Sequence, residues 1–377
     1  MPRTLQQHFA PNGQKRILAL DGGGVRGVLS LAFLERIEKL LAERAGSTEF
    51  RLSDYYDLIG GTSTGAIIGT GLALGYRVTE LIQLYCDLSS ETFRDANLLG
   101  GLFAPKFRTE PLMRMVQQHV GTETLGSSRL RTGLAVVAKR LDTNSVWVFH
   151  NNPHGKYFDS QEKVPTFTPN RDLPLTSIIR ASTAAPTYFA PEIIAIAPGV
   201  DGAFVDGGVS PHNNPALLML MVAGISGYGF NWPLGADRLM ITSVGTGTYN
   251  IPFDRNSMAG LTGMGVGLTA LRSLMTDTAT LVETMMQWMG ACANPWRIDS
   301  QIGDLSSDRF GGSEWFQYQR YNVELSLAWL KRHLGLDLPA KSVARLAEID
   351  RVEVIQELLD IGRRAAEIQV SPTHLPE

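Results

Sequence analysis

The sequence is poor in cysteine, in net charge and in long apolar runs. Its 377 residues include two cysteines, Cys86 and Cys292, too few for a disulfide framework, so we expect a reducing compartment. The 34 Lys and Arg against 37 Asp and Glu leave a net charge of −3, and we therefore expect no nucleic-acid partner. No run of 18 uncharged apolar residues occurs, so no transmembrane helix is expected.

The first residues, MPRTLQQHFAPNGQKR, also lack the apolar stretch of a secretory signal peptide. We therefore predict a cytoplasmic protein, with peripheral contact to a membrane left open. The composition, 44% hydrophobic and 19% charged, is typical of a globular protein, and the length suits one large domain or two modest ones.

Strands and helices alternate along the first 250 residues. The apolar run Ile17–Leu20 and its glycine turn precede apolar residues at helical spacing from Val28 to Leu41. The same order recurs where Leu58-Ile59-Gly60 runs into GTSTG and then into AIIGTGLAL. Further strands are predicted at 134–141, 145–150, 203–208 and 239–247, and further helices at 78–88, 175–182 and 352–369. This alternation predicts an α/β three-layer sandwich, in which helices flank a mainly parallel central sheet.

The chain has no internal repeat and no break in composition that marks a linker. We predict one catalytic domain over residues 14–250 and a mostly helical C-terminal extension, residues 251–377, packed on the same domain. Residues 89–109 have weak periodicity and are predicted to form a loop or lid.

The segment DGGGVRG at residues 21–27 presents bare backbone N–H groups to an anion. Gly22, Gly24 and Gly27 satisfy G-x-G-x-x-G between a predicted strand and a predicted helix, as in a dinucleotide-binding fingerprint. That fingerprint needs an acid about 20 residues later, at the end of the next strand. Glu43 lies near that distance but inside the predicted helix. A nucleotide-binding protein, either a reductase or a sensor, stays as an alternative.

The segment GTSTG, with Gly61, Ser63 and Gly65, fits G-x-S-x-G between a predicted strand and a predicted helix. On such a turn a serine hydroxyl is exposed on a strained backbone, and the helix N-terminus favours an anion beside it. A tight turn capped by the serine explains the pattern equally well. A nucleophilic serine would also need a base, because a hydroxyl is a weak nucleophile at neutral pH.

Asp206 is better placed to be that base than any of the seven histidines. It ends a predicted strand and precedes Gly207 and Gly208, which permit the close approach of another loop. An Asx turn made by the Asp-Gly pair is the alternative. His212 follows in a turn. A triad of Ser63, Asp206 and His333 would have the α/β-hydrolase order, but only one predicted strand precedes the elbow, too few for that fold.

Five segments resemble, in order, the signatures of the patatin-like phospholipases. They are DGGGVRG (21–27), GTSTG (61–65), ASTAAPTYF (181–189), DGG (206–208) and NNP (213–215), and the resemblance covers roughly residues 14–250. It implies a Ser63–Asp206 dyad without histidine, and an oxyanion loop formed by Gly22, Gly23, Gly24 and Arg26. The side chain of Arg26 would either contact a substrate phosphate or brace the loop.

The resemblance also implies an activity, the hydrolysis of acyl esters of glycerophospholipids or other lipids at a membrane surface. Such a phospholipase A or lysophospholipase would use no cofactor and no metal. The sequence contains no His-rich cluster and no calcium-loop pattern. Some bacterial members of the family are switched on by cyclic dinucleotides, so a small nucleotide activator is a further alternative. The oligomeric state is left open.

Residues 258–290 are rich in methionine, which suits adaptable apolar surfaces. The six methionines are Met258, Met264, Met275, Met285, Met286 and Met289. A lid or a membrane-docking surface is one interpretation of this segment, and the core-facing side of a helix is the simpler alternative.

Overall fold

The computed structural model describes residues 3–92, 110–160, 162, 165–249 and 263–377. Within them, nine strands form one sheet in the order β5-β6-β3-β2-β1-β7-β9-β8, and β4 pairs with β3 beside this path. The strands are β1 (Lys15–Leu20), β2 (Leu58–Thr62), β3 (Gly133–Arg140), β4 (Ser145–His150), β5 (Glu192–Ala197), β6 (Val200–Asp206), β7 (Leu239–Val244), β8 (Ala291–Cys292) and β9 (Gln317–Tyr321).

The pairing of the sheet is parallel from β3 through β2, β1, β7 and β9 to β8. Strands β4 and β6 pair antiparallel with β3, and β5 pairs antiparallel with β6. The mainly parallel sheet predicted from the sequence is therefore confirmed, with an antiparallel group at one edge.

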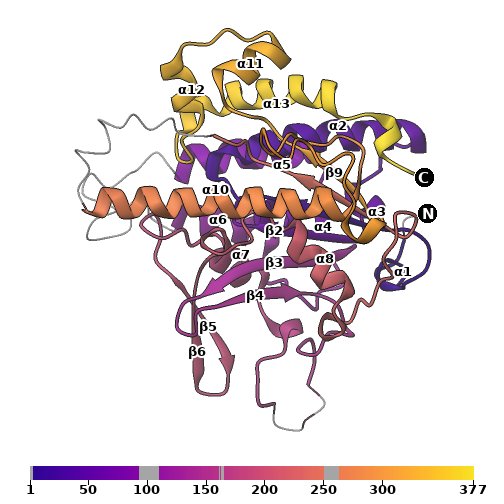
Figure 1. The fold of residues 1–377 in the computed structure, drawn as a ribbon. Coiled ribbons are helices and arrows are strands. Elements are labelled where there is room, and N and C mark those ends of the chain that lie inside the picture. Colours follow the sequence, from indigo (N-terminus) through magenta and orange to yellow (C-terminus); the bar gives the residue numbers. More distant parts are fainter. Residues whose placement is uncertain (1–2, 93–109, 161, 163–164, 250–262) are drawn as a thin grey trace.

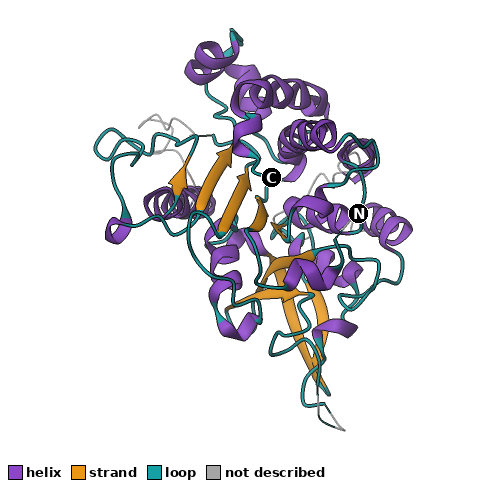
Figure 2. Cartoon of the chain, turned by 90° about the vertical axis from the view of Figure 1, so that its right-hand side faces the viewer, coloured by secondary structure: helices purple, strands orange, loops and turns teal. Residues whose placement is uncertain are grey.

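Helices cover both faces of this sheet, so the molecule has three layers (Figures 1 and 2). The helices are α1 (Leu5–Phe9), α2 (Gly27–Ala45), α3 (Leu52–Tyr55), α4 (Thr64–Ala73), α5 (Val78–Thr92), α6 (Glu110–Val120), α7 (Leu175–Ser182), α8 (Ala216–Gly224), α10 (Gly263–Met289), α11 (Leu327–Leu334), α12 (Ala340–Leu346) and α13 (Ile355–Gln369). This arrangement is the predicted three-layer sandwich.

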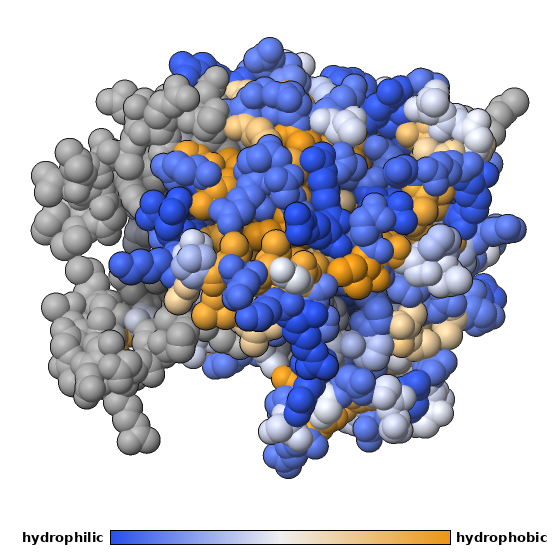
Figure 3. Space-filling view, turned by 90° about the horizontal axis from the view of Figure 1, so that it is seen from above, coloured by the Kyte–Doolittle hydropathy of each residue, from blue (hydrophilic) through white to orange (hydrophobic). Residues whose placement is uncertain are grey.

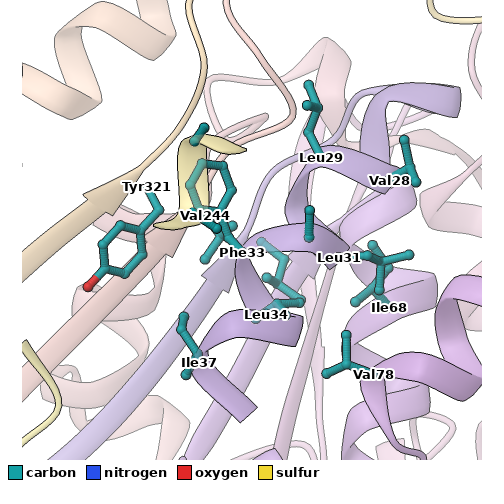
Figure 4. Packing of buried hydrophobic residues seen from close by; sticks show 14 of the residues in the cluster. Val28, Leu29, Leu31, Phe33, Leu34, Ile37, Ile68, Val78, Val244 and Tyr321 are labelled. Atoms are coloured by element: carbon teal, nitrogen blue, oxygen red, sulfur yellow. The ribbon is translucent and has the colours of Figure 1, made fainter. Parts of the chain in front are cut away.

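Strand β1 contributes to two of the three hydrophobic cores in the described residues, because successive side chains of a strand point to opposite faces. Leu18 and Leu20 pack in the core that α2, α5 and α13 cover, whereas Ile17 and Ala19 pack in the core that α8 and α10 cover. Figure 4 shows the first of these cores. There the ring of Phe33, on α2, stacks on that of Tyr321, on β9, with centroids 6.0 Å apart.

The last third of the chain is mostly helical, but it also completes the central sheet. Strands β8 and β9 extend the sheet beyond β7, and α13 packs along α2. Gly362 permits this packing, since a Cβ at this position would lie 2.7 Å from the Cβ of Ala32. No local pattern indicates β8 and β9, because both strands are short and β9 joins the sheet through β7, which lies far away in the chain.

Two surface predictions depend on segments that are only partly described. Helix α5 continues to Thr92, so the first residues of the predicted loop 89–109 are helical, and residues 93–109 lie outside the described part. In the described residues, no helix combines the length and the apolar character needed to cross a bilayer. Figure 3 shows patches of apolar side chains among hydrophilic ones on the face seen from above.

Candidate active site

Ser63 occupies the sharp turn between β2 and α4, with φ 55° and ψ −120°. Residues other than glycine rarely adopt this backbone region, and such strain clusters at functional sites. Gly61 and Gly65 permit the turn: a Cβ on Gly61 would overlap the carbonyl of Gly65, and a Cβ on Gly65 would overlap the carbonyl of Leu20. The motif G-x-S-x-G therefore has the strand-turn-helix geometry of a nucleophile elbow.

Asp206 reaches Ser63 because β3 is longer than β2. Thr62, at the end of β2, pairs with Val137, and β3 continues for three more residues. Strand β6 runs back along this overhang and ends where Asp206 pairs with Ala138. The Ser63 hydroxyl donates to Oδ2 of Asp206 at 2.5 Å.

The two glycines after Asp206 keep its carboxylate in place. Gly207 and Gly208 begin a short 3₁₀ turn, Gly207–Val209, and the N–H of Gly208 donates to Oδ1 of Asp206 at 2.7 Å. Asp206 is 6% exposed, and none of the ion pairs among the described residues includes it. Burial raises the pKa of Asp206 to about 6, against the hydrogen bonds from Ser63 and Gly208. The carboxyl group can therefore gain and lose a proton near neutral pH, as a general base must.

The glycine loop lies against Ser63. A Cβ on Gly22 would be 3.2 Å from the Cβ of Ser63. The N–H of Gly22 donates to the carbonyl of Asn213 at 3.0 Å, so it is already engaged. Among the described residues, no acceptor takes a hydrogen bond from the N–H of Gly23 or Gly24. These two amides, rather than that of Gly22, are the donors free to bind an oxyanion.

Arg26 lies where the loop enters α2. Burial lowers its pKa to about 10, against the effects of Tyr85 and Asp21. Its Nε is buried, and no group in the described part of the chain accepts a hydrogen bond from it. Both predicted roles of Arg26, the phosphate contact and the brace, stay predictions.

The histidines that were weighed as bases do not join the site through their rings. His212 contributes its main-chain oxygen, which accepts from the Thr62 hydroxyl at 2.6 Å, while its Nδ1 is buried without a partner among the described residues. The ring of His333 stacks on Trp329, with centroids 4.9 Å apart. Within the described residues, no hydrogen bond links either ring to Ser63 or Asp206.

Three further residues shape the site without having been predicted to do so. Ser182 accepts the N–H of Ser63 at 2.9 Å and donates to the carbonyl of Val137 at 2.6 Å, so it ties the elbow to β3. Asn213 and Thr246 both bind Gly22, the latter by donating its hydroxyl to the Gly22 carbonyl at 2.8 Å. Ser182 and Asn213 lie in two of the segments that resemble the family, and this was the only signal for them.

Two other kinds of site, a dinucleotide-binding site and a metal site, can be compared with the structure. Glu43 lies in the last turn of α2, and β2 ends at Thr62 rather than at an acid, so the ribose-binding half of a dinucleotide fingerprint does not form there. In the part of the chain that is described, no group of three or more His, Cys, Asp and Glu side chains is arranged to hold a metal ion.

The methionine-rich segment forms α10 from Gly263 onward. Met286 is fully buried against Phe316 and Tyr318, so the simpler interpretation, a core-facing residue, is confirmed for this methionine. Met275, Met285 and Met289 are half-buried. Met258 and the side chain of Met264 lie outside what the structure describes.

Comparison with known proteins gives a family match over the strand-rich part of the chain. Residues 18–220, more than half of the chain, match the family model described as patatin-like phospholipase. A cGAMP-activated phospholipase of Escherichia coli (strain TW11681) is 33% identical over 55% of this chain and 55% of that protein. The chain thus spans about half the length of that relative.

A cGAMP-activated phospholipase of Vibrio cholerae serotype O1 is 29% identical over 80% of this chain and 86% of that protein. The solved structure of human GIVD cytosolic phospholipase A2 aligns with 98% of this chain and 61% of its own, at 10% identity and a TM-score of 0.40. That likeness is too distant to bear on the site.

Proposed function

The chain belongs to the patatin-like phospholipase family, and from this premise we propose that it is a lipid acyl hydrolase. Its substrates in this proposal are acyl esters of glycerophospholipids. The observation that carries the proposal is the hydrogen bond, 2.5 Å long, from the strained, half-buried Ser63 to the buried Asp206, a carboxylate without a cation partner among the described residues.

In the first half-reaction, the Ser63 oxygen attacks the ester carbonyl carbon while its proton moves to Oδ2 of Asp206. The negative charge that develops on the carbonyl oxygen is stabilised by the N–H groups of Gly23 and Gly24. Removing one such donor typically costs about 10²–10³-fold in kcat. The tetrahedral intermediate then collapses, Asp206 gives its proton to the leaving alkoxide, and an acyl-Ser63 ester and a lysolipid result.

In the second half-reaction, the ionised Asp206 takes a proton from a water molecule that attacks the acyl-Ser63 carbonyl. The same amides stabilise the second oxyanion. Collapse of this intermediate returns the proton from Asp206 to the Ser63 oxygen and releases the fatty acid. We propose that no metal takes part, because Asp206 supplies the base and the glycine loop supplies the charge stabilisation. Treatment with EDTA is then expected to leave the activity unchanged.

The test is hydrolysis of phosphatidylcholine vesicles, followed by mapping of a fluorophosphonate label by mass spectrometry. We expect release of fatty acid and lysophospholipid, and a label on Ser63 that is absent from Ser63→Ala. A protein that releases neither product from lipid, and that takes no label at Ser63, would not be the proposed hydrolase.

The cellular location and the membrane contact are part of the same proposal. A cytoplasmic enzyme with this substrate must meet a bilayer at its surface, and α10 exposes Leu274 and Leu281, each 58% accessible. Replacing both by serine is expected to reduce activity on vesicles about tenfold and to leave hydrolysis of p-nitrophenyl butyrate unchanged. If the variant keeps wild-type activity on vesicles, or loses the same fraction of activity on both substrates, α10 does not form the membrane contact.

A second candidate function is a phospholipase that a cyclic dinucleotide switches on. The observation that favours it is the similarity to the two bacterial relatives, each of which is named a cGAMP-activated phospholipase. Activity on vesicles is then expected to be low until cGAMP is added and to rise steeply with it. Full activity without nucleotide, and no change on adding it, would favour the constitutive hydrolase.

A further inference from the structure

The glycine loop begins at a buried aspartate. An arginine from the last third of the chain donates two hydrogen bonds to its carboxylate. Asp21 directly follows β1, and its Oδ1 and Oδ2 accept from Nη1 and Nη2 of Arg320 at 2.9 and 2.6 Å. Both side chains are less than 10% exposed. Arg320 lies on β9, outside the residues that match the family model. Nη1 of Arg320 also donates to the Ser243 hydroxyl at 2.7 Å.

The guanidinium of Arg320 is fixed from its other side by α10. Its Nε lies 3.3 Å from Oε2 of Glu283, and the hydroxyl of Tyr318 donates to the same oxygen at 3.1 Å. Burial alone would lower the pKa of Arg320, but Asp21 and Glu283 raise it further than burial lowers it, so the guanidinium is charged at neutral pH. Acceptors on two sides hold the planar guanidinium in one orientation. The two hydrogen bonds from the guanidinium therefore hold the Asp21 carboxylate in place as well.

The other end of the loop is also fixed by the last third of the chain. The N–H of Val25 donates to the carbonyl of Ile349 at 2.8 Å. Gly24 has φ +59°, and a Cβ there would overlap that same carbonyl oxygen. Between these two anchors, Asp21 and Val25, lie the amides of Gly23 and Gly24 and the contact of Gly22 with Ser63.

We propose that Arg320 is a positioning residue for acyl transfer, and that through it the C-terminal extension sets the place of the oxyanion loop beside Ser63. The inference rests on the proposed hydrolase function. Arg320 touches neither substrate nor Ser63 and acts through Asp21. A displacement of about 1 Å at a reacting centre can cost about 10²-fold in rate. A loop that loses one anchor is therefore expected to lower kcat even where the protein stays folded.

An ordinary buried salt bridge is the competing explanation, and buried ion pairs are weak evidence for a special role. The two explanations differ in what they predict for the transition state. A structural pair changes the fraction of folded protein, whereas a positioning pair changes kcat of the folded protein and its affinity for an oxyanion mimic.

The test compares Arg320→Lys and Arg320→Met with Arg3→Met in the full chain. Arg3 is the matched control, because it also pairs with a buried aspartate, Asp57, but lies at the opposite end of the sheet. Three quantities are measured: kcat per mole of folded protein and KM for p-nitrophenyl butyrate, and the inhibition constant of an alkyl trifluoromethyl ketone. Ser63 adds to this ketone, its proton passes to Asp206, and the resulting alkoxide needs the same two amides.

We expect kcat to fall about 100-fold in Arg320→Met and about tenfold in Arg320→Lys, which keeps the charge but not the two-pronged contact. We expect KM to stay within about twofold, and the inhibition constant to rise in step with the loss of kcat/KM. Arg3→Met is expected to melt at a lower temperature than wild type and to keep the wild-type kcat, KM and inhibition constant.

Unchanged kcat and inhibition constant in folded Arg320→Lys would overturn the proposal, whether or not Arg320→Met folds. So would an equal loss of kcat in Arg3→Met. A wild-type protein that neither hydrolyses the ester nor takes a fluorophosphonate label on Ser63 would overturn the proposed function, and this inference with it. An active, labelled wild type with unaffected Arg320 variants overturns the inference alone.

Discussion

The two ends of the central sheet both bury aspartates, but they treat them differently. At the amino end, Asp57 precedes β2 and is fully buried beside two cations, Nη1 of Arg3 at 2.6 Å and Nζ of Lys15 at 3.6 Å, and beside Nδ1 of His8 at 3.0 Å. At the carboxyl end, Asp21 is paired with Arg320, whereas Asp206 accepts hydrogen bonds, among the described residues, only from the hydroxyl of Ser63 and the N–H of Gly208.

The difference shows which buried carboxylate is free to take part in proton transfer. Asp57 and Asp21 neutralise cations and order the segments that carry them, the N-terminal residues in one case and the glycine loop in the other. Among the described residues Asp206 has no cation partner, and burial raises its pKa to about 6, whereas at Asp21 the charge of Arg320 opposes the pKa increase that burial causes. Of the three buried aspartates in the described part of the chain, the one without a cation partner, Asp206, is the one that contacts the nucleophile.

The largest expected effect separates Asp206 from Asp57 by activity. Asp206→Asn keeps the shape of the side chain but removes the base, so we expect kcat on p-nitrophenyl butyrate to fall about 10⁴-fold, as when a catalytic aspartate is neutralised elsewhere. The matched control, Asp57→Asn, is expected to keep the kcat of its folded fraction. Circular dichroism reports the folded fraction in both cases. An active Asp206→Asn would contradict the role of Asp206.

The next expected effect concerns stability, and here Asp57→Asn, rather than Asp206→Asn, is expected to show the loss. Asp57→Asn leaves Lys15, which is 2% exposed, without its carboxylate, and we expect it to lose about 3–5 kcal/mol of unfolding free energy. Urea titration at pH 8 measures this loss. A loss under about 1 kcal/mol would show that the cations find other partners.

Asp206→Asn is expected to gain stability at pH 8. The folded pKa of Asp206, about 6, lies above the ordinary 3.8, so the folded state binds the proton more tightly, and wild-type stability falls as the pH rises through this window. The shift corresponds to at most about 3 kcal/mol. Asparagine does not ionise and escapes this loss. The gain should vanish at pH 3.5; a gain that is independent of pH would contradict the account.

A smaller effect compares single hydroxyls at the two ends. Ser182→Ala removes the acceptor of the Ser63 N–H, and we expect kcat to fall about tenfold as the elbow loosens, with a stability loss of about 1–3 kcal/mol. Thr132, whose buried hydroxyl donates to the carbonyl of Tyr56 at the amino end, is the control. Thr132→Ala should show a similar loss of stability and an unchanged kcat. Equal kcat values in the two variants would remove Ser182 from the positioning of Ser63.

Much of the carboxyl end could be predicted from the sequence, because its signals are local. The glycines around Ser63 predict a tight turn in which main-chain segments approach each other closely. Asp206 is recognisable because it ends a predicted strand and precedes two glycines. That β6 runs antiparallel along the overhang of β3 was not predictable, since it depends on the relative lengths of two strands far apart in the chain.

The anchors of the glycine loop were equally hidden. Arg320 lies 299 residues after Asp21, on a five-residue strand whose pairing with β7 no local pattern indicates. The carbonyl of Ile349 carries no side-chain signal at all. Main-chain contacts and long-range ion pairs are set by the completed sheet, so a sequence motif can indicate the loop but not what fixes it.

The most direct test of the central claim is the pH dependence of the rate at which a fluorophosphonate labels Ser63. If Asp206 is the base and must be ionised, the rate should fall as the pH drops through a midpoint near the pKa of about 6, and His212→Gln should leave this profile unchanged. Asp206→Asn should label very slowly and without this midpoint. An unchanged profile in Asp206→Asn, or its loss in His212→Gln, would contradict the Ser63–Asp206 dyad.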